Sequence, residues 1–152
     1  MQAVVANAVA RQWIASRIGL GHLSRAARGI CAVDERGTIR GGVLYDTWAP
    51  NSVQAHMATE TPIAWRALLP HVFIYPFLGP KADGADGRGV IFSLIRGSNA
   101  RSLAMAKSLG FREADRIRDG YNMGEDYVRV EMRREECRFL HGWPRAARKE
   151  AA

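Results

Sequence analysis

The chain has 152 residues, 47% of them hydrophobic, and a formal net charge of +7. This length suits one domain with one core, and this hydrophobic content argues against disorder. No apolar run approaches the roughly 20 residues that cross a bilayer, and the apolar N-terminus lacks the basic segment of a signal peptide. The cysteines, Cys31 and Cys137, predict no disulfide framework. We therefore expect a cytoplasmic protein with neither a membrane partner nor a metal site.

The first half of the chain predicts one helix and three strands. The helix covers residues 3–18 and ends at the glycines that follow. Residues 28–34 and 39–48 predict two paired strands around a turn that contains Gly37, and thus a hairpin. Residues 53–59 then predict a third strand.

The centre of the chain predicts a second helix, a loop and a buried strand. Thr61 and Pro62 supply a hydroxyl cap and a proline at the first helical position, while Pro70 is expected to kink or split the helix. Residues 79–89, rich in Gly, Asp and Pro, predict a surface loop. Residues 90–96 form an almost unbroken apolar run, which is typical of a strand covered on both faces.

The segment after this strand predicts a short helix with clear limits. Asn99 can cap the helix by accepting a backbone N–H from its first turn. Leu103, Ala106 and Leu109 repeat at helical spacing and predict an apolar stripe. Gly110 suits the left-handed residue that ends a helix, and Phe111 can fold back on the last turn.

The remainder predicts two strands, near residues 113–118 and 126–133, and a loose basic tail over residues 141–152. The predicted domain therefore covers residues 1–140. Strands and helices alternate in the centre and hairpins flank them, which indicates an α+β fold. We expect a twisted mixed sheet of about six strands with helices on both faces.

Two blocks of the sequence resemble a known enzyme family. The strand at 90–96, Asn99, the following helix and the closing Leu109-Gly110-Phe111 resemble a unit of the GNAT (Gcn5-related) N-acetyltransferases. Residues 124–140, together with Tyr75-Pro76-Phe77 and His56-Met57-Ala58, resemble the phage- and prophage-encoded branch of that superfamily.

The resemblance implies that acetyl-CoA binds in a wedge where the strand at 53–59 separates from the strand at 90–96. The pantetheine arm would pair with the backbone at Met57, Ala58 and Thr59, and one N–H there would stabilise the oxyanion. Free N–H groups of the next helix, at Ile63 and Ala64, would hold the pyrophosphate. Asn99 and Ser102 would lie near the pantetheine arm, although Asn99 is also explained as a helix cap.

The sequence departs from the family in two places. Residues 60–66 lack the glycines of the usual pyrophosphate loop, and Ala106 replaces a tyrosine that protonates the departing thiolate. His56 and Glu60 are the candidate general bases, with Tyr45 and Tyr121 as further acid–base candidates. Each also has a structural explanation, His56 as a hydrogen-bonded residue of the sheet and Glu60 as a solvated carboxylate at a helix start.

The leading hypothesis is transfer of an acetyl group from acetyl-CoA to a small-molecule or protein amine in a ternary complex. The sequence leaves the oligomeric state open, with a homodimer as one option. One alternative function is that of a non-catalytic GNAT-like protein of phage assembly or host interaction. The other is an acyltransferase directed to nucleic acid, which the basic charge alone suggests.

Overall fold

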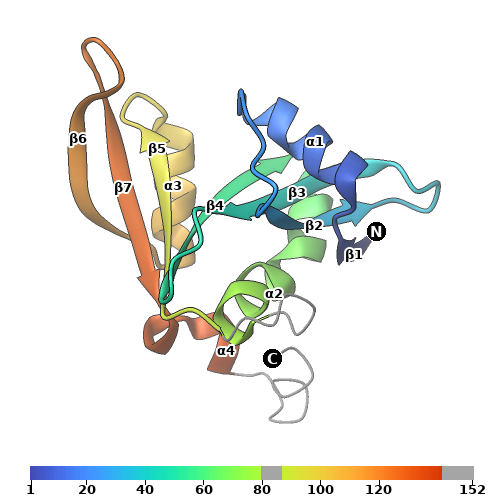
Figure 1. Ribbon diagram of the computed structural model, residues 1–152. Coiled ribbons are helices and arrows are strands. Elements are labelled where there is room, and N and C mark those ends of the chain that lie inside the picture. The colour runs from blue at the N-terminus through green and yellow to red at the C-terminus, as the bar shows by residue number, and fades with distance from the viewer. Residues whose placement is uncertain (80–86, 142–152) are drawn as a thin grey trace.

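A computed structural model describes residues 1–79 and 87–141. Seven strands form one sheet in the order β1-β2-β3-β4-β5-β7-β6, and Figure 1 shows this sheet opening into two parts between β4 and β5. The strands are β1 (Gln2–Val5), β2 (Arg28–Val33), β3 (Ile39–Asp46), β4 (Ser52–Thr59), β5 (Val90–Arg96), β6 (Arg112–Asn122) and β7 (Glu125–Arg133).

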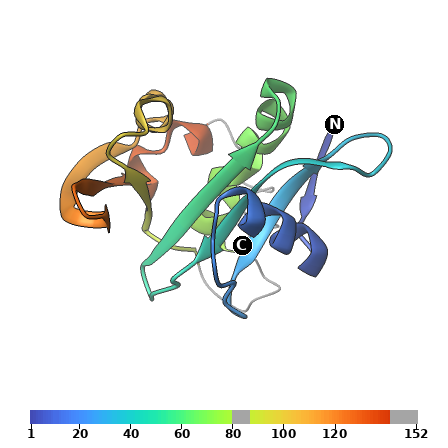
Figure 2. The ribbon, with the colours of Figure 1, turned by 90° about the horizontal axis from the view of Figure 1, so that it is seen from above.

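Helices cover both faces of the sheet, as predicted. Helix α1 (Ala8–Arg17) packs on one face of β2, β3 and β4, whereas α2 (Pro62–Leu78) and α3 (Ala100–Leu109) lie on the other (Figure 2). A 3₁₀ turn, η2 (Arg134–Glu136), and the short α4 (Arg138–His141) follow β7. No helix of the described residues is both long and apolar enough to cross a membrane.

The N-terminal prediction was wrong in one respect, because a strand precedes the first helix. Residues Gln2–Val5 pair antiparallel with β2, and these added ladder bonds make the sheet seven-stranded instead of about six-stranded. The helix starts later because the Asn7 side chain accepts a hydrogen bond from the N–H of Ala10 at 2.9 Å. An Ala- and Val-rich segment can form either a helix or a strand, so the pairing with β2 determines that it is a strand.

Helix α2 runs without a break through Pro70 and Pro76, so the predicted split does not occur. Pro76 has no N–H to donate to the carbonyl of Val72 one turn earlier. The hydroxyl of Tyr45, fully buried in β3, donates to that carbonyl at 2.8 Å instead. A side chain of the sheet thus supplies the hydrogen bond that the proline removes.

The end of α3 matches its prediction. Gly110 has φ of 104°, and the N–H groups of Gly110 and Phe111 bond the carbonyls of Lys107 and Ala106, each at 3.0 Å. Phe111 is buried and its ring lies 6.2 Å from that of Phe73 in α2. The local signals of this segment therefore agree with its packing.

Other predicted boundaries moved. β3 ends at Asp46 because Thr47 takes φ of 51°, outside strand geometry. β6 and β7 are longer than predicted and meet at Met123 and Gly124, so most of the expected connection is strand.

Cys31 and Cys137 are free and buried, and burial raises the pKa of both thiols. The loose tail was predicted for 141–152, but His141 is the last residue of α4. Residues 142–152, and residues 80–86 of the predicted loop, lie outside the described residues.

Candidate active site

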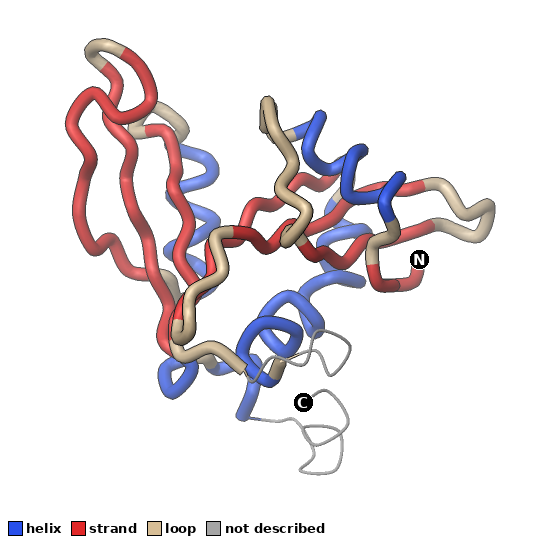
Figure 3. Tube along the Cα trace, in the orientation of Figure 1, coloured by secondary structure: helices blue, strands red, loops and turns tan. Residues whose placement is uncertain are grey.

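The strands β4 and β5 are parallel but pair only at their first residues. Ser52, Val53 and Gln54 pair with Val90, Ile91 and Phe92, and beyond them the strands diverge, as Figure 3 shows. The predicted separation of these strands is therefore confirmed. At the point of divergence the Ser93 hydroxyl donates to the carbonyl of Ala55 at 2.7 Å.

The backbone of β4 turns alternate polar groups toward this opening. The N–H of Glu60 donates to the carbonyl of Arg40 in β3 at 2.9 Å. Since successive residues of a strand direct their N–H and C=O groups to opposite sides, those of Met57 and Thr59 face β5. Met57 thus presents a donor and an acceptor in the wedge.

The wedge holds a cavity of ≈ 790 Å³ with two unlike walls. The wall on the side of α2 and α3, called here the helix wall, carries small and apolar residues. It includes Ala55, Met57, Ser93, Asn99, Ser102, Met105 and Ala106. The wall on the side of α1, called here the aromatic wall, carries rings and charges. It includes Trp13, Arg17, His56, Leu94, Arg96, Tyr121 and Tyr127.

His56 belongs to a polar cluster at the aromatic wall. Its Nε2 lies 3.0 Å from Oδ1 of Asp46, and the two side chains are only 18% and 15% exposed. The hydroxyl of Thr47 lies 3.3 Å from the same carboxylate oxygen and 3.4 Å from Oε1 of Gln54. His56 lines the cavity, so it is placed to act on a bound molecule.

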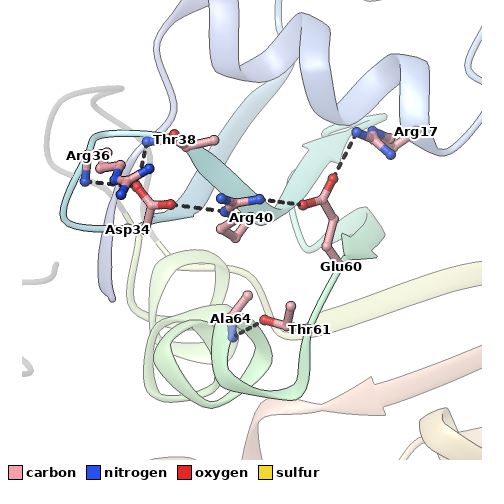
Figure 4. A network of polar contacts seen from close by, with 8 residues as sticks. All are labelled: Arg17, Asp34, Arg36, Thr38, Arg40, Glu60, Thr61 and Ala64. Atoms are coloured by element: carbon pink, nitrogen blue, oxygen red, sulfur yellow. Dashed lines mark hydrogen bonds and ion pairs between the residues drawn. The ribbon is translucent and has the colours of Figure 1, made fainter.

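Glu60 occupies the rim of the cavity in an ion-pair network (Figure 4). Its oxygens lie 2.8 Å from Arg17 and 3.5 Å from Arg40, and Arg40 also bonds Asp34 at 3.0 Å. Hydrogen bonds from the Thr38 backbone N–H and from Arg40 hold the pKa of Asp34 below its usual range. The Glu60 carboxylate therefore ties α1 and β3 to the end of β4.

The start of α2 offers fewer free donors than the sequence suggested. The hydroxyl of Thr61 caps the helix and accepts the N–H of Ala64 at 3.2 Å, and Pro62 has no N–H. Ile63 keeps an N–H in the first turn, and its side chain is 62% exposed. A phosphate here would use Ile63 directly and would displace Thr61 to reach Ala64.

The start of α3 confirms the predicted cap. The side chain of Asn99 accepts the N–H of Ser102 at 3.1 Å, and both residues line the cavity. Nearby, Arg96 bonds the Glu125 carboxylate at 3.1 and 3.3 Å, and the Ser98 hydroxyl bonds the same carboxylate. These two contacts lower the pKa of Glu125.

Tyrosines of the β6–β7 hairpin line the same cavity as Ala106, the residue that replaces the helix tyrosine, but from the other wall. Ala106 is buried in the helix wall. Tyr121 and Tyr127 line the aromatic wall with ring centroids 5.5 Å apart, and the Arg96 guanidinium lies 4.2 Å from the Tyr121 ring. Tyr45 is a core residue with a raised pKa, caused first by burial, and does not line this cavity.

The residues that sequence reasoning missed come from distant parts of the chain. Trp13 and Arg17 lie in α1, Asp46 ends β3, and Tyr127 lies in β7. Of these four residues, Asp46 alone had a local sequence signal of a functional role, because it is a polar residue at the end of an apolar strand. The others reach the site through packing that no spacing rule predicts.

Solved structures resemble this architecture at low sequence identity. The spermidine N-acetyltransferase of Vibrio cholerae in complex with CoA and spermine is 12% identical, with a TM-score of 0.66 over 92% of this chain and 99% of that chain. A dodecameric structure of the same enzyme has a TM-score of 0.64, at 12% identity over 88% and 95% of the two chains. The chain has the GNAT fold.

A second solved neighbour comes from another organism. The N-acetyltransferase PseH of Campylobacter jejuni, in complex with acetyl coenzyme A, has a TM-score of 0.54 at 12% identity, over 73% of this chain and 70% of that chain. No protein-family model matches the sequence, and no curated protein matches it. The likeness is therefore one of fold, and the chemistry has to be argued from the residues of the wedge.

Proposed function

We propose that the protein is an acetyl-CoA-dependent N-acetyltransferase that acts on an amine. The single observation that carries this proposal is the wedge, where β4 leaves β5 and directs the N–H of Met57 into a cavity. The solved neighbours with CoA or acetyl coenzyme A bound support acetyl-CoA as the co-substrate. The helix wall suits the thin, largely apolar pantetheine arm, with Thr59 at the end of β4 and Asn99 and Ser102 on α3. Ala58 lines the cavity from the α1 side, and its backbone groups face β3.

The two walls suggest how the reaction proceeds. The ammonium group of an acceptor at the aromatic wall loses a proton to His56, and the neutral amine then attacks the thioester carbonyl, which forms the C–N bond. The N–H of Met57 stabilises the oxyanion. The C–S bond then breaks, its electron pair leaves with sulfur, and the thiolate takes up the proton that the acylated nitrogen releases.

His56 is better placed than Glu60 as the general base. His56 lies within the cavity with one ring nitrogen bonded to Asp46. Both oxygens of Glu60 are held by arginines at the rim. We therefore assign the proton transfer to His56, and Glu60 remains the second candidate until its variant is measured.

The acceptor is an amine of unassigned structure, and the phage or prophage origin, the cytoplasmic location and a homodimer remain predictions from the sequence. Two observations favour the non-catalytic alternative. The cap at Thr61 occupies the N–H of Ala64, and Pro62 removes another phosphate donor. The experiment must therefore test cofactor binding before it tests turnover.

Calorimetric titration with acetyl-CoA is the deciding measurement, followed by detection of free CoA thiol with a panel of amines. We expect saturable binding, and a stabilisation of about 2.7 kcal/mol at about 100 times the dissociation constant. No heat and no melting shift at millimolar acetyl-CoA would overturn the proposal. Binding that weakens with salt and a preference for DNA would favour the nucleic-acid alternative.

A matched pair of variants on α3 locates the binding site. Ser102→Trp places a large ring in the cavity and should abolish acetyl-CoA binding. Ala104→Trp places the same ring on the exposed side of the helix and should leave binding unchanged. Equal affinities in the two variants would show that the cofactor does not use this wedge.

A further inference from the structure

We propose that Asp46 positions the imidazole of His56 so that Nδ1, and not Nε2, accepts the proton of the acceptor amine. This inference rests on the proposed acetyl transfer. Its basis is the 3.0 Å contact between His56 Nε2 and Asp46 Oδ1, made by two side chains that are 18% and 15% exposed. Asp46 carries no role in the sequence interpretation.

The contact determines which nitrogen of His56 carries the proton. An ionised carboxylate only accepts hydrogen bonds, so the Nε2 atom that faces it must be the donor. The neutral ring then keeps its lone pair on Nδ1, and the tautomer is set by the partner of the other nitrogen. A base needs that lone pair available to the substrate.

The position of the two residues agrees with this division of roles. His56 lines the cavity, whereas Asp46 does not. Asp46 pairs with Gln54, and His56 pairs with Leu44, so the carboxylate sits two residues farther toward the closed end of the wedge. The imidazole therefore lies between the carboxylate and the cavity.

The backbone around Asp46 is held in an unusual conformation. Thr47 has φ of 51°, a region that β-branched residues rarely occupy. Such conformations persist where the surroundings over-determine them, and they occur often at functional sites. The Thr47 hydroxyl lies within hydrogen-bond distance of both Asp46 and Gln54, so the turn fixes the carboxylate beside the ring.

Two of the arginines that line the cavity have carboxylate partners of their own. Arg17 of α1 binds Glu60 at the end of β4, and Arg96 of β5 binds Glu125. Among the described residues, Asp46 is the carboxylate that bonds His56. After proton transfer the imidazolium would face this carboxylate, which stabilises the charge that forms.

The tautomer is measured directly by long-range ¹H–¹⁵N correlation spectra of the ¹⁵N-histidine-labelled protein at a pH where the ring is neutral. We expect His56 of the wild type to carry its proton on Nε2. In Asp46→Asn the amide can donate to Nε2, so the proton should move to Nδ1 in a measurable fraction of molecules. A wild-type proton on Nδ1, or an unchanged tautomer in the variant, would overturn the inference.

Kinetics supply the second arm of the test. Asp46→Asn should lower kcat by about 10²-fold or more with an unchanged dissociation constant for acetyl-CoA, and Asp46→Glu should restore part of the loss. Asp115→Asn is the control. It removes a carboxylate that lies 2.7 Å from Arg129, and Asp115 does not line the cavity. It should retain the wild-type kcat.

The two arms separate the inference from the proposed function. A wild type that transfers acetyl to no amine defeats the proposed function, while the spectra still decide whether Asp46 sets the tautomer. An active wild type whose Asp46→Asn variant keeps its kcat defeats the inference alone.

Discussion

The helix wall and the aromatic wall of the cavity are built in different ways. Most of the helix wall comes from one continuous segment, residues 90–111, with β4 opposite. The aromatic wall joins α1, β4, β5 and the β6–β7 hairpin, from Trp13 to Tyr127. The first wall carries small and apolar side chains and depends on local packing, whereas the second holds charges whose partners lie on other elements. We therefore expect variants of the two walls to fail in different steps.

The largest effect is expected from the proposed base in the aromatic wall. His56→Ala should lower kcat by about 10²-fold or more while acetyl-CoA binding stays the same, because the base acts on the amine and not on the cofactor. Initial rates and calorimetry measure the two quantities. Glu60→Gln is the companion variant, and a greater loss of kcat there than in His56→Ala would reverse our assignment.

Two adjacent glycines of β3 test the walls through packing. A Cβ at Gly42 would lie 2.3 Å from Cδ1 of Ile14, which is fully buried in α1, whereas a Cβ at Gly41 meets its nearest atom at 3.1 Å on the opposite face. Gly42→Ala should therefore cost about 1–3 kcal/mol of unfolding free energy by overpacking. Urea unfolding measures this loss.

The Gly42→Ala and Gly41→Ala variants should also differ in their KM values. A shift of α1 moves Trp13 and Arg17, so Gly42→Ala should raise the KM for the amine and leave that for acetyl-CoA unchanged. Gly41→Ala should lose less stability than Gly42→Ala. Equal losses in the two variants would show that α1 adjusts without strain.

The two asparagine caps provide a smaller and cleaner comparison. Asn99→Ala and Asn7→Ala each remove one side-chain bond to a helix N–H, at 3.1 and 2.9 Å, and each should cost about 1 kcal/mol. Only Asn99 lines the cavity. Asn99→Ala should therefore also weaken acetyl-CoA binding, and an affinity equal to that of Asn7→Ala would leave the cap as its single role.

The smallest effect concerns Glu125, which holds Arg96 at the aromatic wall. Arg96 and Ser98 lower the pKa of Glu125 in the folded state, so its contribution is present above the unfolded pKa and is lost as pH falls through the folded one. Glu125→Gln should thus be less stable than the wild type at neutral pH, and the difference should vanish in acid. Urea unfolding from neutral to acid pH measures this difference in stability. Removal of Arg96 should abolish most of the pH dependence of the difference.

The helix wall shows how much of the site the sequence predicts. Asn99, the stripe at Leu103, Ala106 and Leu109, and the stop at Gly110 are all where the pattern places them. Each depends on contacts within a few residues, which sequence spacing reflects. The missed strand β1 and the unbroken α2 are the opposite case, because their bonds come from β2 and from Tyr45.

The sequence by itself determined the α+β class, the strand–cap–helix–glycine unit of residues 90–111 and the strand that carries His56, Met57, Ala58 and Thr59. Periodicity and capping depend on residues close together in the sequence, so they can be predicted from the sequence directly. Only the tertiary structure decided that Asp46 bonds His56, that two arginines hold Glu60, and that tyrosines of a distant hairpin line the same cavity as Ala106. These contacts depend on strand register and on where β4 leaves β5, and register is set by packing across the whole sheet.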